Sequence, residues 1–219
     1  MEIFQRFIEI VGTSKVPVIF EFGTCDGQHT NIMCNILKQM NKSFKYYAFE
    51  ADYRIVPAFW HVNKNHQSVI NFVQAAIGSI DGEVTFNLSG GEEKRPGHFQ
   101  QAFYGSSSIK NPLLVTEFWP DMTFEQTTVK SMRLDTFASN QNLDIIDFIW
   151  SDIQGAESDL IEGGSETLMR TRYFYTEYSN DELYEGAINA KSILKKLPGK
   201  WSIVEDYESD VLFKNENLN

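Results

Sequence analysis

The chain has 219 residues, enough for one domain with a substantial core, and no Pro-, Gly- or Ser-rich linker divides it, so we expect a single domain over residues 1–219. Its formal net charge of -11 argues against a nucleic-acid binder or a protein of anionic membrane surfaces, because the surface would repel phosphates. Nowhere do eighteen apolar residues follow one another, and we expect no membrane insertion. Cys25 and Cys34 are the only cysteines, which argues against a disulfide framework and favours a reduced cytoplasmic protein.

The N-terminal part of the chain predicts a helix, a strand, a glycine turn and a second helix. Apolar residues recur at helical spacing over 3–11 and stop before a glycine. The apolar run 18–22 predicts a strand, two glycines four residues apart predict a tight turn, and helical periodicity resumes over 32–40. The turn is the most informative feature of this part.

A glycine turn lets a ligand approach the backbone, and the following helix offers unpaired N–H groups. Glu21 ends the strand, where a carboxylate is badly placed for a phosphate but suits a cationic or amine-bearing ligand. S-adenosylmethionine carries a sulfonium and an ammonium group, whereas a purely structural strand–turn–helix is the alternative. The predicted cofactor contacts of this stretch are Glu21, Gly23, Thr24, Asp26 and Gly27.

A second acid stands at the end of the next predicted strand. Residues 46–50 are rich in strand formers and end at Glu50, which in a doubly wound fold would accept hydrogen bonds from two ribose hydroxyls. A solvent-exposed strand end is the alternative. A helix is expected over 54–63 and a third strand over 69–77, which completes two βαβ half-turns. Further cofactor contacts are predicted at Ala51, Ala76 and Ile77.

An alternating strand is expected at 83–88, and after it the periodic spacing of apolar residues becomes irregular. Residues 89–128 are interpreted as an acceptor-binding insertion or lid. The only basic cluster of this acidic chain lies there, interleaved with aromatic residues that would suit a ring-bearing, hydroxylated acceptor. A solvated loop that packs on its own aromatics is the alternative. The predicted acceptor contacts in this segment are Lys94, Arg95, His98, Tyr104, Ser106 and Ser107.

Regular structure returns with a buried-looking strand over 144–152 that ends at Asp152. A helix through Leu160 and Leu168, a strand over 173–177, a helix over 181–197 and a terminal β pair are expected to follow. Four predicted strands thus end in acids at one edge of the sheet, at Glu21, Glu50, Asp152 and Glu177.

The motif Glu21-x-Gly23-x-x-x-Gly27, followed by Glu50, resembles the nucleotide half of class I S-adenosylmethionine-dependent methyltransferases. The segments 105–108, 129–137 and 152–164 resemble the serine pair, the Leu-Asp-x-Phe element and the Asp-x-Glu-Gly-x-Glu turn of the FkbM type. The resemblance implies an α/β, Rossmann-like, doubly wound and mostly parallel seven-stranded sheet with an antiparallel terminal strand. It also implies S-adenosyl-L-methionine as cofactor and O-methylation of a hydroxyl on a sugar, glycan or natural product.

Gln154 departs from that pattern, because the family usually has Glu there, and this weakens a role of that position in base catalysis or metal binding. Asp152 is the first candidate base and also a predicted cofactor contact, since ligands of open α/β sheets bind at the carboxyl edge. His98 is a weaker candidate base, as is His29. Glu177 is a predicted acceptor contact.

Several alternatives stay open at this point. Glu157 could orient the ammonium group of the cofactor or be a first-turn helix acid. Asp152, Glu177 and Asp181 could converge on a metal, but carboxylates at strand ends need no cation, and we expect none. A catalytically inactive cofactor- or glycan-binding protein is one alternative function. A nicotinamide-dependent oxidoreductase is disfavoured, because the third glycine of Gly-x-Gly-x-x-Gly is missing. The sequence leaves the oligomeric state open.

Overall fold

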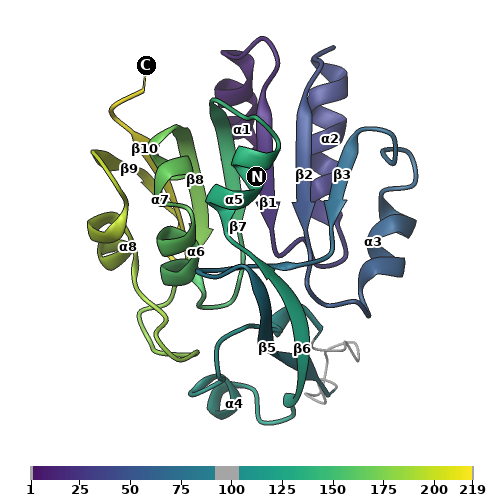
Figure 1. Ribbon diagram of the computed structural model, residues 1–219, viewed down its shortest axis with the longest axis vertical. Helices are drawn as coiled ribbons and strands as arrows, with labels where there is room; N and C mark the ends of the chain where they lie inside the picture. The colour runs from purple at the N-terminus through teal and green to yellow at the C-terminus, as the bar shows by residue number, and fades with distance from the viewer. Residues whose placement is uncertain (1, 92–103, 219) are drawn as a thin grey trace.

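The computed structural model describes residues 2–91 and 104–218 (Figure 1). Its central sheet has seven strands in the order β3-β2-β1-β7-β8-β10-β9 within those ranges. The strands are β1 (Val18–Phe22), β2 (Lys45–Phe49), β3 (Ile70–Val73), β7 (Ile146–Ser151), β8 (Thr171–Glu177), β9 (Trp201–Asp206) and β10 (Asp210–Asn215). Neighbours from β3 to β8 are parallel, whereas β10 runs antiparallel to both β8 and β9. The predicted mostly parallel seven-stranded sheet with an antiparallel terminal strand is confirmed.

Helices cover both faces of this sheet, because alternate residues of its strands send apolar side chains to opposite sides. Ile19 and Phe148 pack with residues of α1 (Glu2–Gly12), α2 (Gln28–Gln39) and α3 (Val56–Val62). Phe20 and Ile149 pack on the other side with a second group of helices. That group comprises α5 (Leu134–Asn140), α6 (Glu157–Gly163), α7 (Ser165–Met169) and α8 (Ala190–Lys196). The fold is therefore doubly wound, as predicted.

A second sheet of three strands lies beyond the carboxyl ends of the central strands, below them in Figure 1. Its order is β4-β6-β5, with β4 (Ala76–Ile77), β5 (Gly82–Gly90) and β6 (Thr123–Met132). The single strand expected over 69–77 is wrong, because the chain leaves β3 at Val73 and pairs again with β6 through Ala76 and Ile77. The 3-10 helix η1 (Tyr104–Ser106) and α4 (Val115–Phe118) lie between β5 and β6 in the sequence.

Three expected element boundaries are corrected by the structure. Residues 89–128 are less irregular than expected, since β5 and β6 extend into both ends of that segment as an antiparallel ribbon. The helix through Leu160 and Leu168 divides into α6 and α7. The helix expected over 181–197 is only α8, because Asn189 caps it by accepting a hydrogen bond from the Ser192 N–H, which fixes its start.

Within residues 2–91 and 104–218, no helix combines the length and the apolar character needed to cross a membrane. Both Cys25 and Cys34 are free thiols.

Candidate functional site

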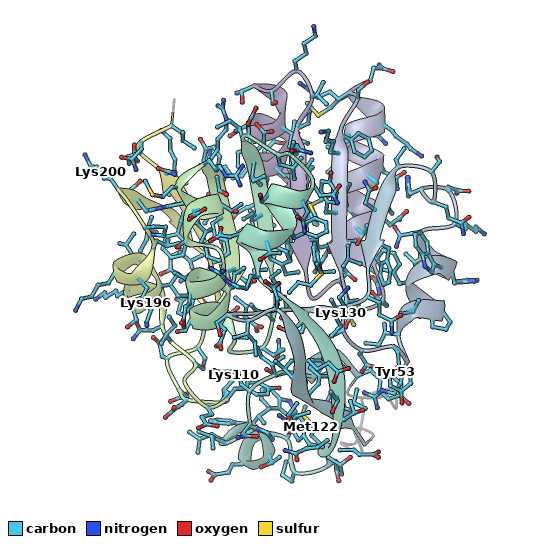
Figure 2. The ribbon with its side chains drawn as sticks, in the orientation of Figure 1. Tyr53, Lys110, Met122, Lys130, Lys196 and Lys200 are labelled. Atoms are coloured by element: carbon cyan, nitrogen blue, oxygen red, sulfur yellow. The ribbon has the colours of Figure 1, made fainter. Side chains whose placement is uncertain are left out.

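A cleft opens where the carboxyl ends of β1, β2 and β7 face the second sheet. It encloses about 570 Å³ of space, its open mouth included. Figure 2 shows side chains of the second-sheet region, including Met122 and Lys130, below the central sheet. The residues that line the cleft are Phe22, Gly23, Cys25, Phe49, Glu50, Ala51, Ile55, Ala75, Ala76, Ile77, Phe86, Tyr104, Gly105, Ser107, Ser108, Ile109, Asp152, Ile153 and Ala156. This placement at the carboxyl edge is where open α/β sheets bind ligands.

Gly23 joins the three central strands at the base of the cleft. The N–H groups of Gly23 and Thr24 both donate to the Phe49 carbonyl, at 3.0 and 3.2 Å. The φ of Gly23 is 74°, and a Cβ there would lie 1.7 Å from the Asp152 carbonyl oxygen. Only glycine fits this position, since both its backbone conformation and the close approach of Asp152 exclude a side chain.

Gly27 serves packing rather than the cleft. A Cβ at Gly27 would lie 2.2 Å from the Nδ2 atom of Asn63, which donates to the Gly27 carbonyl. The second glycine of the motif therefore brings the start of α2 against the end of α3. Gly27 does not line the cleft.

Glu50 presents a hydrogen-bonded carboxylate on the cleft wall. Its Oε2 accepts the Cys25 N–H at 2.8 Å and its Oε1 accepts the Asp52 N–H at 2.7 Å. Burial raises the pKa of Glu50 to about 7, against the lowering effect of these backbone hydrogen bonds. Each oxygen keeps further acceptor capacity, so this carboxylate can accept two hydroxyl donors at once.

A buried ion pair links the Glu50 loop to the second sheet. Arg54 donates two hydrogen bonds to the fully buried Asp52, from Nε to Oδ1 at 2.9 Å and from Nη2 to Oδ2 at 2.5 Å. The same Nη2 donates to the Ser89 carbonyl of β5, and the guanidinium lies 4.7 Å from the centroid of the Tyr104 ring. The Ser107 hydroxyl also donates to Asp52, at 3.1 Å. Arg54 and Asp52 thus contact Tyr104 and Ser107 respectively, two residues of the opposite cleft wall.

We expect Asp52→Asn to lower the free energy of unfolding by about 2 kcal/mol, because the substitution leaves the charge of Arg54 without its partner. The cost is below that of a fully buried pair, since Arg54 is partly exposed. Urea unfolding measures the change. The matched control is Asp159→Asn, which breaks a half-buried ion pair with Lys110 and should cost less than about 1 kcal/mol. Equal losses in the two variants would contradict this assignment of the Asp52 pair.

Three polar side chains meet at the ends of β7 and β8. The Nε2 atom of Gln154 lies 2.6 Å from Oδ1 of Asp152 and 2.7 Å from Oε2 of Glu177. Burial, followed by the charge of Asp152, raises the pKa of Glu177 well above its ordinary value. The Asp152 side chain lines the cleft, whereas Glu177 does not.

Two further acids lie close to the cleft but are enclosed. Glu21 is buried and its Oε2 accepts the hydroxyls of Thr30 and Tyr46, both at 2.5 Å, so its carboxylate is satisfied away from the cleft. Glu157 is buried at the first turn of α6. Burial raises the pKa of both carboxyl groups to about 7.

The structure brings together only part of the predicted site. Eight predicted residues line the cleft: Gly23, Glu50, Ala51, Ala76, Ile77, Tyr104, Ser107 and Asp152. Six do not line it: Glu21, Thr24, Asp26, Gly27, Ser106 and Glu177. Of these six, Asp26 accepts hydrogen bonds from Gln28, and Ser106 accepts one from the Tyr184 hydroxyl through its carbonyl. Lys94, Arg95 and His98 lie outside the described residues.

Sequence reasoning missed the apolar walls of the cleft. Phe49, Ile55 and Phe86 read as ordinary core residues, and their alignment along one cavity needed the fold. Cys25 had one usable signal, its position between the two glycines of the turn. His29 is exposed, with its ring 4.6 Å from that of Trp150, and does not line the cleft.

No group of three or more His, Cys, Asp or Glu side chains in 2–91 and 104–218 is placed to hold a metal ion.

Comparisons with known proteins point to one family. The pattern of the methyltransferase FkbM domain matches residues 21–210. The chain is 34% identical over 207 residues to the 2-O-methyltransferase NoeI of Sinorhizobium fredii. The aligned region covers 92% of this chain and 81% of that protein. The crystal structure of a methyltransferase FkbM from Methylobacillus flagellatus KT superimposes with a TM-score of 0.53 at 13% identity, over 91% of this chain and 44% of that one. This chain thus spans less than half of the latter's length, and that likeness shows the shared fold.

Proposed function

This chain belongs to the methyltransferase FkbM domain family, and from that membership and the geometry of the cleft we infer that it O-methylates a hydroxyl group of a sugar, glycan or natural product. Its cofactor is S-adenosylmethionine, which supplies a methyl group on a positively charged sulfur when it is bound. The family match favours this reaction over the nicotinamide-dependent alternative. The name of the 2-O-methyltransferase relative supports oxygen as the acceptor atom.

The residues of the cleft fit this cofactor. Glu50 would hold the two ribose hydroxyls, because its oxygens are fixed by the backbone and keep free lone pairs. Ala76, Ile77 and Phe86 offer an apolar surface for the adenine ring. Gly23 and Asp152 line the cleft together, and the amino-acid end of the cofactor would lie beside them.

We assign Asp152 as the group that takes the proton of the acceptor hydroxyl. An alcohol is a poor nucleophile, and a carboxylate that removes its proton contributes about 100-fold to 10,000-fold. Asp152 is half-buried, lies at the carboxyl end of the central β7 strand and faces the cleft. The rest of the acceleration is supplied by holding the two substrates in line, which is a matter of positioning.

One experiment tests this function directly. Calorimetric titration with S-adenosylhomocysteine should show micromolar binding at one site. Methyl glycosides, oligosaccharides, nucleotide sugars and phenolic natural products should then be incubated with S-adenosylmethionine, and a mass increase of one methyl group is the expected product. Binding without any methylated product would favour the inactive binding protein, and absence of binding would refute the cofactor site.

We expect Asp152→Asn to lower kcat by about 100-fold to 10,000-fold, because an amide cannot accept the hydroxyl proton. Rates are measured at saturating cofactor so that any change in its affinity is separated from the chemical step. Asp144→Asn is the matched control, since Asp144 is exposed just before the opposite end of the same strand. A kcat for Asp152→Asn within threefold of the parent would rule out this role.

We further propose a cytoplasmic protein, supported by the two unpaired thiols, which are usual in reducing compartments. A small-molecule or glycan acceptor, rather than nucleic acid, is consistent with the acidic chain. Homo-oligomerisation stays a prediction, which size-exclusion chromatography with light scattering can test.

A further inference from the structure

The side-chain amide of Gln154 stands between two carboxyl groups that come from different strands. Asp152 follows β7, and Glu177 ends β8. The single nitrogen Nε2 contacts both of them, at 2.6 and 2.7 Å, and so uses both of its N–H groups. The reverse orientation would place the amide oxygen against at least one unprotonated carboxyl oxygen, which is electrostatically unfavourable.

The backbone of Gln154 is held independently of this side chain. Its φ is 51°, in the left-handed region, and its carbonyl accepts the Ser108 hydroxyl at 2.8 Å. The Ser108 oxygen in turn accepts the Lys110 N–H at 3.0 Å. The turn after β7 is therefore hydrogen-bonded to the segment that follows η1, and the backbone that carries the Gln154 amide is held in place.

We propose that Gln154 is a positioning residue, which bridges the Asp152 and Glu177 carboxyl groups and so keeps the pair in its ionised form with Asp152 oriented toward the cleft. This inference rests on the proposed function, because it assigns a role to Asp152 in the same site. Two close carboxyl groups cannot both ionise cheaply, so they share protons as a pair. An N–H donor to each favours the ionised form of the pair over the fully protonated form.

Other titratable groups act on the same pair. Besides Asp152, the carboxyl groups of Asp210 of β10 and Glu157 of α6 act on Glu177, and both favour its protonation. The phenols of Tyr175 and Tyr184 also interact with these acids, and the burial of each raises its pKa, so both stay neutral. The amide of Gln154 therefore offsets repulsion that these surrounding acids increase.

The test measures the Kd of S-adenosylhomocysteine against pH for the parent protein, Gln154→Met and Gln154→Glu. Methionine keeps the length and flexibility of the side chain but donates no hydrogen bond. Without the amide, the pair takes up protons at higher pH, so the acidic limb of the binding curve should move up by about one pH unit. Gln154→Glu adds a third acid and should move it further in the same direction. Well above this range, the Kd values should agree within threefold.

Gln28→Met is the matched control, because the Gln28 amide also donates to a carboxylate, Asp26, but lies outside the cleft. Its curve should coincide with that of the parent. Glu50 titrates within the cleft in every variant, so its contribution cancels in the comparison. An acidic limb that stays in place in Gln154→Met would overturn the inference, even if its affinity falls, because a merely structural role lowers affinity without shifting the curve. A parent protein that binds no S-adenosylhomocysteine would instead overturn the proposed function.

Discussion

Glu50→Gln should weaken the binding of S-adenosylhomocysteine by about 100-fold or more. Hydrogen bonds to a charged group contribute about 1.5–3 kcal/mol each, and two hydroxyls lose that partner. The substitution also turns one carboxylate oxygen into an NH2 group, which must then face the N–H of Cys25 or Asp52. A donor that faces a donor displaces the side chain from the wall of the cleft. Calorimetry at pH 8 measures the loss.

The pH dependence gives the same prediction a second readout. Burial raises the pKa of Glu50 to about 7, so its ionised form predominates above that value and is lost as the pH falls through it. Affinity in the parent should therefore decline below about pH 7. In Glu50→Gln the contribution of this group to the decline should disappear.

Glu182→Gln is the matched control for this experiment. The Glu182 carboxylate also accepts a backbone N–H, that of Gly186, at 2.9 Å, but it does not line the cleft. Its affinity for S-adenosylhomocysteine should stay within twofold of the parent. Unchanged binding in Glu50→Gln would remove Glu50 from the cofactor site.

The sequence predicts the strand ends of the site better than its walls. Glu50 and Asp152 could be placed together because parallel strands bring their carboxyl ends to one edge, a consequence of topology alone. Glu21 fitted the same rule, yet its side chain turns to the hydroxyls of Thr30 and Tyr46. Alternation along a strand decides this, and a motif does not reveal which of its residues face the ligand.

The second sheet was beyond the reach of local patterns. β5 was visible as an alternating strand, but its partner β6 lies more than thirty residues later. Pairing over such a distance leaves no short-range signal, because neither strand is joined to the other by a recognisable turn. The division between β3 and β4 could not be predicted for the same reason. Ala76 and Ile77 form a separate strand because they pair with Ser131 and Met132 of the distant β6.

Gly23→Ala should destabilise the fold by about 2–5 kcal/mol, for two reasons. A residue with a Cβ would have to adopt the left-handed backbone conformation, and its Cβ would overpack against a rigid neighbour. The added Cβ would lie 1.7 Å from the Asp152 carbonyl oxygen. No rotamer change relieves this overlap, because both atoms are fixed to the backbone. The ends of β1 and β7 must separate, which also displaces Asp152 and should abolish binding of S-adenosylhomocysteine.

Gly186→Ala separates the two causes in Gly23→Ala. Gly186 has the same φ of 74°, but the nearest atom to its added Cβ is Cε of Lys110 at 3.8 Å, an ordinary contact. This variant should lose only the backbone contribution, about 1–2 kcal/mol. Urea unfolding of both variants therefore measures the overlap as their difference. Equal losses would mean that the β1 turn tolerates a side chain, and the close approach of Asp152 would then not be what fixes the base of the cleft.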